Sequence, residues 1–523
     1  MKKSSVSTGA KTTKLAFAKS SVGLGFTASA NAILTIRGYS VLKTDMNALE
    51  TESMKKILTV APKALPTFAG KVAPFPLYLE SSLRWYLPRA WARNRYGPPA
   101  RDDMPLGDPL RDDLTFGGSP RDHQVKAIAT FRDADHNGIL CLPCGYGKTF
   151  TAIAIAAQLK RRFVVVVHKE FLLDQWSGEL RTLMPGIRIG RIQGERCDIG
   201  PEFDCAIAMI QTICSRTYPA GVFSGFGLAI FDEAHHLGAE HFSQTLQRIQ
   251  CKAMLGLTAT PQRTDGLSKV FEWFLGPIVF QISKRDEDET VRVEAMRFAS
   301  DNPAYATPPT NWRGEIIRAR LLNQIAEFRP RTEALLNWIH EVLQTEGRKL
   351  LILSDRREHL MAFEEGIKKR GWPSVGYYVG GMKQVDLDKS AQAQVILGTF
   401  AMAAEGMNIP TLNAVLLATP KSSVEQSIGR ILRQRPEERA VAPLIMDVLD
   451  TAFMECYGQW NKRKRTYKDC GYKVRWYGDP DSEADEHADE DGGDGKKQKG
   501  KCLIADKDCC DSICPECVDT AGI

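Results

Sequence analysis

A glycine-rich segment, Leu142-Pro-Cys-Gly-Tyr-Gly-Lys148-Thr149, has the residue types and spacing that phosphate binding requires. Its glycines at 145 and 147 allow a tight turn whose N–H groups face phosphate oxygens, next to the positive N-terminus of the helix-like run that follows. Lys148 would neutralise the β and γ phosphates of ATP, and Thr149 would ligate Mg²⁺. The residues predicted to contact the nucleotide here are Cys144, Gly145, Tyr146, Gly147, Lys148 and Thr149. The strict GxxxxGK[ST] pattern fails at Leu142, and a glycine-rich turn with a chance Lys-Thr is the alternative.

Two adjacent carboxylates follow another apolar run, where Leu228-Ala-Ile-Phe231 leads directly into Asp232-Glu-Ala-His235. Ligands of open α/β sheets bind at the carboxyl ends of the strands, so both acids would lie at the binding edge. Asp232 would hold Mg²⁺ through water, and Glu233 would orient and deprotonate an attacking water. An exposed acidic turn is the alternative interpretation.

Three further segments could complete a nucleotide site. The Gln124 amide, some twenty residues before the glycine-rich loop, could contact the adenine edge, which presents a donor and an acceptor. The hydroxyls of Thr258 and Thr260 could couple the carboxylates to groups across a cleft. Arg430 and Arg433 are spaced to share one helix face and could stabilise charge on the γ-phosphate as arginine fingers. An ordinary surface helix is the alternative for the two arginines.

Short continuous apolar runs alternate with amphipathic stretches through most of the chain, as expected for strands buried on both faces of parallel sheets. The predicted helices include Thr149 to Lys160 and Glu333 to Gln344. The predicted strands are Ile139 to Leu142, Phe163 to Val167, Cys205 to Ile210, Leu228 to Phe231, Met254 to Leu257, Leu350 to Leu353, Gln394 to Phe400, Ala414 to Ala418 and Ala442 to Val448. The pattern predicts an α/β fold with two tandem RecA-like P-loop domains.

The predicted organisation has six parts. They are a basic arm over 1–40, an N-terminal accessory domain over 41–116, a RecA-like ATP-binding domain over 117–283, a linker over 284–330, a second RecA-like domain over 331–477, and an acidic then Cys-rich tail over 478–523. The basic arm is interpreted as disordered, with a transit peptide as the alternative. Tail cysteines, including the pair Cys514 and Cys517, either bind a structural Zn²⁺ or remain reduced thiols.

Composition excludes few functions, and the pattern of apolar runs predicts no insertion into a membrane. The chain of 523 residues is 43% hydrophobic and 25% charged, enough for more than one core. Its net charge of +6 permits a polyanionic partner. No apolar run reaches the roughly 18 residues that a membrane span needs. Scattered cysteines without secretory spacing indicate an intracellular, reducing location in cytoplasm or nucleus.

The ordered set of motifs resembles that of the superfamily 2 helicases: the phosphate loop, DEAH, Thr-Ala-Thr and QxxGRxxR. The stretch from Val167 to Trp176 resembles their motif Ia, and Gly398-Thr399 with Glu405-Gly406-Met-Asn408 resembles motif V. The chain is further similar to xeroderma pigmentosum group B-type repair helicases and to helicases of large nucleocytoplasmic DNA viruses, including the poxvirus transcript-release type. Arg263-Thr264-Asp265 departs from the Arg-Glu-Asp motif of the repair helicases, so no role of that glutamate is carried over.

The resemblance implies further site residues. Glu405 and Gly406 would belong to the nucleotide site. Loops opposite the ATP cleft would contact nucleic acid through His168, Lys169, Gln211, Thr212, Ser354, Arg356 and Thr399. Interleaved cations and aromatics from Trp460 to Trp476 either stack on bases or form a basic helix with its aromatics packed on the core.

The motifs therefore predict an ATP-dependent helicase, acting on DNA rather than RNA, with the 3′ to 5′ polarity usual for the resembling group. Transcription or repair machinery would be its partner, and no membrane is expected. The alternatives are a duplex DNA translocase that does not separate strands, an RNA helicase, and a clamp that binds nucleic acid without turnover.

Overall fold

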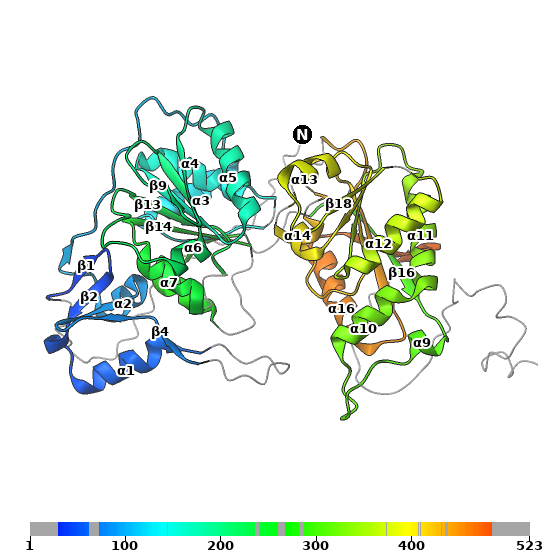
Figure 1. Ribbon diagram of the computed structural model, residues 1–523, viewed down its shortest axis with the longest axis horizontal. Coiled ribbons are helices and arrows are strands. Elements are labelled where there is room, and N and C mark those ends of the chain that lie inside the picture. The colour runs from blue at the N-terminus through cyan, green and yellow to red at the C-terminus, as the bar shows by residue number, and fades with distance from the viewer. Residues whose placement is uncertain are drawn as a thin grey trace, which may run out of the picture. The chain divides into compact units, whose positions relative to one another are not determined.

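The computed structural model describes residues 30–61, 73–143, 145–235, 240–259, 267–282, 287–372, 374–405, 407, 409–429, 431–432, 434 and 438–483. The chain divides into two compact units, Met1–Ser283 and Lys284–Ile523. Each unit contains an eight-stranded, mainly parallel sheet (Figure 1). The predicted α/β fold with two parallel-sheet domains is confirmed.

The sheet of the first unit carries the phosphate-loop and DEAH segments. Its order is β11-β10-β12-β9-β13-β14-β8-β15, and every neighbouring pair is parallel except β10 with β11. The strands are β8 (Asn137–Cys141), β9 (Phe163–Val167), β10 (Ile189–Gln193), β11 (Arg196–Cys197), β12 (Cys205–Met209), β13 (Leu228–Phe231), β14 (Ala253–Thr258) and β15 (Ile278–Gln281). The predicted bounds of β9 and β13 match those observed.

Helices cover both faces of this sheet, and its central strands β9 and β13 are therefore buried along their whole length. Alternate residues of each strand join two different cores, so Val165 packs with one helix layer and Val166 with the other. One layer is α3 (Asp122–Asp133), α4 (Lys148–Leu159) and α5 (Glu170–Leu183), and the other includes α6 (Ile210–Ser215), α7 (Glu240–Arg248) and α8 (Ser268–Leu275).

The N-terminal segment forms a small five-stranded sheet in the order β5-β6-β2-β1-β7. Its elements are β1 (Ile33–Thr35), β2 (Gly38–Leu42), a 3-10 turn (Lys43–Asp45), α1 (Ala48–Leu58), β5 (Leu79–Glu80), β6 (Arg84–Leu87), α2 (Arg89–Tyr96) and β7 (Arg101–Asp102), beside a separate pair, β3 (Thr59–Val60) and β4 (Phe75–Pro76). The expected arm over residues 1–40 therefore ends before Ala32, which is fully buried. Residues 1–29 lie outside the described part of the chain.

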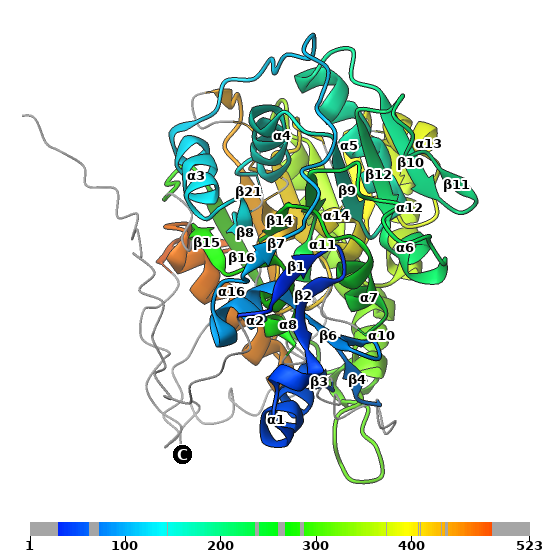
Figure 2. The ribbon, with the colours of Figure 1, turned by 90° about the vertical axis from the view of Figure 1, so that its left-hand side faces the viewer.

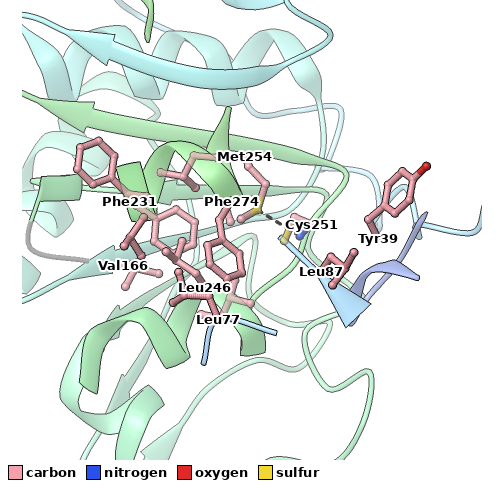
Figure 3. Packing of buried hydrophobic residues seen from close by; sticks show 14 of the residues in the cluster. Tyr39, Leu77, Leu87, Val166, Phe231, Leu246, Cys251, Met254 and Phe274 are labelled. Carbon is pink, nitrogen blue, oxygen red and sulfur yellow. Dashed lines mark hydrogen bonds between the residues drawn. The ribbon is translucent and has the colours of Figure 1, made fainter. Parts of the chain in front are cut away.

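The N-terminal sheet and the first RecA-like sheet share one hydrophobic core. Tyr39 and Leu87 from the small sheet belong to the same cluster as Val166, Phe231 and Phe274 (Figure 3). A buried guanidinium adds a polar link, because Arg89 donates to the Cys251 carbonyl at 2.6 Å and to the Lys252 carbonyl at 3.0 Å. Burial, together with the neighbouring Arg93 charge, lowers the pKa of Arg89 to about 10, which still leaves it cationic at neutral pH.

The second unit contains the order β18-β19-β17-β20-β21-β16-β22-β23, antiparallel only between β22 and β23. The strands are β16 (Arg292–Phe298), β17 (Leu350–Leu353), β18 (Val375–Tyr378), β19 (Val395–Gly398), β20 (Ala414–Leu417), β21 (Leu444–Asp450), β22 (Lys473–Trp476) and β23 (Asp479–Glu483). The helices are α9 (Pro303–Ala306), α10 (Arg318–Glu327), α11 (Arg329–Leu343), α12 (Arg357–Lys369), α13 (Gln384–Ser390), α14 (Phe400–Glu405), α15 (Glu425–Ile428) and α16 (Met454–Asp469).

Two expected boundaries differ from the structure. The segment 284–330, expected as a linker, contains β16, which pairs along its whole length with β21 and also with β22. Its alternation of buried Val293 and Ala295 with polar residues was masked by the charges around it. The expected tail begins with β23, which pairs with β22, so the fold extends to Glu483. The Cys-rich part of the tail lies outside the described residues.

Candidate nucleotide site and nucleic-acid contacts

The phosphate loop joins β8 to α4 at the carboxyl edge of the first sheet. Gly147 is the N-cap of α4 in a left-handed conformation with φ 73°, and Gly145 has φ 87°. Such angles favour glycine, so the sequence permits a turn that presents the N-terminus of α4. Lys148 and Thr149 are the first two helical residues. Cys144 lies outside the described residues.

The loop is fastened to α3 by side chains from the Arg121-Asp-His-Gln segment. Gln124 is buried, accepts a hydrogen bond from the Arg121 N–H at 2.8 Å and donates to the Tyr146 carbonyl at 3.2 Å. His123 Nε2 lies 3.1 Å from the same carbonyl oxygen. The Gln124 amide, predicted to contact adenine, therefore also ties the start of α3 to the phosphate loop. His123 was not predicted, and its position one residue before Gln124 was the signal.

Replacing Gly147 with Ala is expected to weaken nucleotide binding by at least about tenfold. A Cβ at this position would lie 2.3 Å from Gln124 Nε2 in a conformation that L residues rarely adopt, so either the Gln124 amide loses its place against the loop or the loop shifts. Titration with a fluorescent ATP analogue measures the effect. Gly145→Ala is the matched control, because it introduces similar backbone strain with nothing within 4 Å of the added Cβ. Equal losses in both variants would contradict the role of the Gln124 contact.

Asp232 and Glu233 follow β13 directly, and in the sheet order β14 lies between β13 and β8, the strand that leads into the phosphate loop. Asp232 accepts from the Trp176 indole N–H at 2.9 Å through Oδ2 and from the Glu233 N–H at 3.0 Å through Oδ1. Burial, and then the Glu233 carboxylate, raise the pKa of Asp232. Trp176 of α5 ends the stretch that resembles motif Ia, and no role was predicted for it. In the structure it positions the Asp232 carboxylate.

Glu233 lies between a cation and an imidazole. Its Oε1 is 3.6 Å from Lys148 Nζ, and its Oε2 is 3.4 Å from His235 Nδ1. Glu233 itself has φ 47°, an uncommon angle for a residue other than glycine and one that occurs where a site over-determines the backbone. The structure thus brings together the predicted lysine and glutamate.

His235 links the acidic segment to the Thr258 segment. Its Nδ1 is 3.1 Å from Thr258 Oγ1, and Thr258 is fully buried at the end of β14. The Thr258 carbonyl also accepts from the Leu142 N–H at 3.0 Å, at the start of the phosphate loop. Thr258, which was predicted to couple the carboxylates to other groups, is therefore connected to Glu233 through His235. No role was predicted for this histidine from the sequence.

The donor set fits Mg²⁺. Hydroxyl and carboxylate oxygens, the preferred ligands of this hard cation, come from Thr149 and Asp232. A nearby cation would relieve the cost of holding Asp232 charged beside Glu233 in a buried site. Cys141, next to the loop, offers no competing thiolate, because burial raises the pKa of its thiol to about 11. No cluster of three or more His, Cys, Asp or Glu residues suited to a metal occurs within the described ranges.

Several predicted site residues cannot be placed. Thr260, Gly406, Arg430 and Arg433 lie outside the described residues, as do the Arg263 segment, Asn408 and the Glu405 side chain. The backbone of Glu405 ends α14. These residues stay predictions from the motif spacing.

The first-unit residues predicted to contact nucleic acid lie at the same carboxyl edge as the nucleotide residues, farther along the sheet. His168 and Lys169 follow β9, while Gln211 and Thr212 follow β12. Gln211 Nε2 donates to the His168 carbonyl at 2.8 Å, and Thr212 Oγ1 accepts from the Gly194 N–H at 3.1 Å. Gln211 is exposed, whereas His168 and Thr212 are buried. The buried pair therefore shapes this loop cluster, and Gln211 is exposed at its surface.

In the second unit, Ser354 and Thr399 follow the adjacent strands β17 and β19. Ser354 is fully buried, and its Oγ lies 3.2 Å from His359 Nδ1 and accepts from the Arg356 N–H at 3.1 Å. Arg356 donates to the Ala319 carbonyl at 3.1 Å and to Asn323 Oδ1. Arg356 thus fastens the predicted contact loop to α10, and Ser354 holds the backbone of Arg356.

Acidification is expected to destabilise the second unit through His359. Burial, and then the Arg331 charge, lower the pKa of His359 to about 3 in the folded state, below the usual value of about 6.5. The unfolded chain therefore binds a proton first as pH falls below about 6.5, so stability decreases by up to about 1.4 kcal/mol per pH unit between these values. Urea unfolding at pH 7.5 and 5.5 should show a smaller difference in His359→Phe than in wild type. Identical pH dependence in the two proteins would exclude this histidine as the cause.

The segment from Trp460 to Trp476 was expected either to stack on bases or to form a basic helix packed on the core. Trp460, Tyr467 and Tyr472 are buried, and Arg463 donates to Asp447 Oδ2 at 2.8 Å inside the core. Its exposed cations are Lys462, Arg465, Lys468, Lys473 and Arg475. The aromatics therefore pack on the core, which favours the basic-helix interpretation over base stacking.

A family model described as "Type III restriction enzyme, res subunit" matches residues 118–263, which hold the phosphate loop and DEAH segment. A protein of Acanthamoeba polyphaga mimivirus, named as an ATP-dependent RNA helicase, is 32% identical over 460 residues, covering 85% of this chain and 86% of its own length. The chain belongs to the superfamily 2 helicases.

Other relatives of this superfamily 2 helicase are more distant. A protein of African swine fever virus, also named as an ATP-dependent RNA helicase, is 27% identical over 64% of this chain and 69% of its own length. A protein of Escherichia phage T5, named as a helicase, is 25% identical over 66% of this chain and 75% of its own length. The crystal structure of the Pyrococcus furiosus Hef helicase domain compares with a TM-score of 0.45 and 16% identity over 66% of this chain and 98% of that one.

The predicted ATP-dependent helicase activity class is confirmed by these relatives. The expected similarity to helicases of large DNA viruses is also confirmed, while the closer likeness to repair helicases stays a prediction. Within the described part of this helicase, no helix has both the length and the apolar character that crossing a membrane would demand.

Proposed function

We propose that this helicase couples ATP hydrolysis in its first unit to movement along one strand of DNA with 3′ to 5′ polarity. The observation that carries the ATPase part is the convergence of Lys148, Glu233 and His235 at one sheet edge, with contacts of 3.6 and 3.4 Å. The proposal of sequence-tolerant strand contact rests on the loop cluster around Gln211, whose amide suits phosphate oxygens that are the same at every base.

The described residues divide the chemistry among them. Lys148 neutralises charge on the phosphates, and Thr149 and Asp232 would hold Mg²⁺, which would supply positive charge against the phosphates. Glu233 orients the attacking water and accepts its proton, in reach of both Lys148 and His235. Arg430 and Arg433 remain the proposed arginine-finger residues on the strength of the QxxGRxxR spacing alone.

RNA is the second candidate substrate, because two of the relatives are named as RNA helicases. The two candidates are separated by ATPase assays with single-stranded DNA, duplex DNA and RNA, each with and without a fork. Stimulation by single-stranded DNA and unwinding only from a 3′ overhang support the proposal. Stimulation by RNA alone reassigns the substrate. Stimulation by duplex DNA without strand displacement reassigns the enzyme as a duplex translocase, an activity class suggested by the restriction-subunit match.

The ATPase assignment has its own test. Lys148→Ala should abolish the stimulated ATPase rate, because no other described side chain in this loop supplies a cation to the phosphates. Equal rates in wild type and Lys148→Ala with saturating DNA would leave only a clamp without turnover.

A further inference from the structure

One exposed tryptophan in the second unit is held on a tightly built turn. Trp312 is 86% exposed, the highest value among the large hydrophobic side chains of the described ranges. It lies in the loop between α9 and α10, which extends beyond the helices of its unit (Figure 2). A single exposed apolar side chain needs no explanation by itself, so the construction of the turn decides its meaning.

The turn is encoded by Asn311-Trp-Arg-Gly314. The Asn311 carbonyl accepts from the Gly314 N–H at 3.0 Å, which closes a β-turn with Trp312 and Arg313 at its centre. Asn311 Oδ1 accepts from the N–H groups of Arg313 and Glu315, at 2.9 and 3.0 Å. Gly314 has φ 78°, a conformation suited to glycine. Backbone pairing of Thr310 with Ile316 continues the hairpin below the turn.

The base of the hairpin is anchored in the core rather than free. Tyr305 is fully buried among Phe298, Phe328 and Phe453. Gln324 of α10 donates to three carbonyls of the α9 segment, at distances from 2.7 to 2.9 Å. The exposed tip therefore belongs to a short, well-fastened hairpin, which limits the entropy lost when a ligand binds to Trp312.

One cation contacts the exposed ring, and two more follow the hairpin in the chain at the start of α10. The Arg313 guanidinium carbon lies 4.5 Å from the centre of the Trp312 ring. Arg318 and Arg320 are exposed in the first turn of α10, where the helix dipole disfavours positive charge. Their placement is unfavourable for the helix alone and favourable for a polyanion. Glu315 is the acid within this group, and it accepts from Asn311 Nδ2 at 2.8 Å.

The hairpin is also linked to a predicted nucleic-acid contact. Arg356 donates to the Ala319 carbonyl and to Asn323, both in α10, which starts immediately after the hairpin. Arg356 and Ser354 lie at the carboxyl end of β17. A nucleic-acid strand bound at this sheet edge would therefore lie near Arg356. Arg356 is hydrogen-bonded to α10, the helix that begins directly after the hairpin.

We propose that the hairpin of Asn311 to Glu315 is a base-stacking site for the unpaired strand, with Trp312 stacking on a nucleobase and Arg313, Arg318 and Arg320 contacting phosphates. The inference rests on the proposed function, because it requires that the protein engages an unpaired strand. Aromatic side chains stack on any base, so the site is independent of sequence. A strand gripped here at its bases and at the sheet edge by its backbone would be coupled more firmly to the motion of the second unit.

The test compares strands with and without bases. Fluorescence anisotropy measures binding of labelled oligothymidylate or oligouridylate, whichever the wild type binds more tightly, and of an abasic strand of equal length. Trp312→Ala should weaken binding to the strand with bases by about 5- to 100-fold and leave the abasic strand unaffected. Trp312→Phe should restore most of the affinity, because a smaller ring still stacks. ATPase activity without nucleic acid should be unchanged.

A control variant should keep wild-type affinity, and several other outcomes would overturn the stacking site or the proposed function. Met454→Ala, which removes another exposed apolar side chain of the same unit, should bind like wild type. Equal affinity of wild type and Trp312→Ala, or equal losses on both strands, overturns the stacking site and indicates a protein partner or a backbone contact instead. Failure of the wild type to bind any strand, or to show nucleic-acid-stimulated ATPase, overturns the proposed function itself.

Discussion

Replacing Glu233 with Gln is expected to lower the nucleic-acid-stimulated ATPase rate by about 10²- to 10⁴-fold while ATP binding persists. Gln keeps the shape of the side chain but cannot accept the proton of the attacking water. The contacts at 3.6 Å to Lys148 and 3.4 Å to His235 hold the carboxylate in this position, so the loss should appear in kcat rather than in nucleotide affinity. Steady-state ATPase assays and titration with a fluorescent ATP analogue measure the two quantities.

The matched control is Glu195→Gln, which makes the same chemical change at a fully exposed carboxylate of the same unit. Its ATPase rate should stay within about twofold of wild type, because exposed ion pairs contribute little. A Glu233→Gln protein with an unchanged kcat would show that another group activates the water. A protein that no longer bound ATP would indicate instead that Glu233 maintains the phosphate loop.

Replacing Arg331 with Ala is expected to reduce the free energy of unfolding of the second unit by about 3–5 kcal/mol. Arg331 and Asp450 are both fully buried, with Nε and Oδ1 2.6 Å apart, and Arg331 also donates to the Ala418 carbonyl. Burial lowers the pKa of the Arg331 guanidinium, but the Asp450 carboxylate and the neighbouring Tyr305 together raise it by more, so the net shift is upward. Without Arg331, Asp450 would keep only the hydroxyl of Tyr305 as a side-chain partner among the described residues.

Arg370→Ala is the control for this prediction. Arg370 pairs with Glu333, whose side chain is 58% exposed, so its loss should cost less than about 1 kcal/mol. Urea unfolding of wild type and both variants gives the comparison. Similar small effects for the two arginines would mean that water enters the Arg331 site and replaces the missing contacts.

Part of the nucleotide site was predictable because its residues form short motifs, each of which directly follows a strand with a strong apolar signal. Phe163 to Val167 and Leu228 to Phe231 were identified with their observed bounds because they are continuous runs of apolar residues. Once those strands are parallel, their carboxyl ends must meet at one edge. The adjacent positions of Lys148 and Glu233 follow from that geometry.

Other parts of the structure depend on pairings that sequence patterns do not reveal. Strand β16 alternates charged and apolar residues, and only its pairing with β21 and β22 shows that it is central. Trp176 contacts Asp232, and His235 contacts Thr258. In each pair the two residues are distant along the chain, so the sequence does not show that they meet. The burial of Arg463 against Asp447 likewise reverses the usual expectation that arginine is exposed.

The shared core of the first unit sets where a shortened form of this helicase can begin. A fragment starting at residue 117 would retain every described nucleotide-binding residue of that unit, yet it would lack Tyr39 and Leu87, which belong to the same hydrophobic cluster as Phe231 and Phe274 (Figure 3). It would also remove Arg89 and leave the Cys251 carbonyl without that donor. The apolar surface exposed by this truncation would favour aggregation. The small N-terminal sheet is therefore an integral part of the first unit.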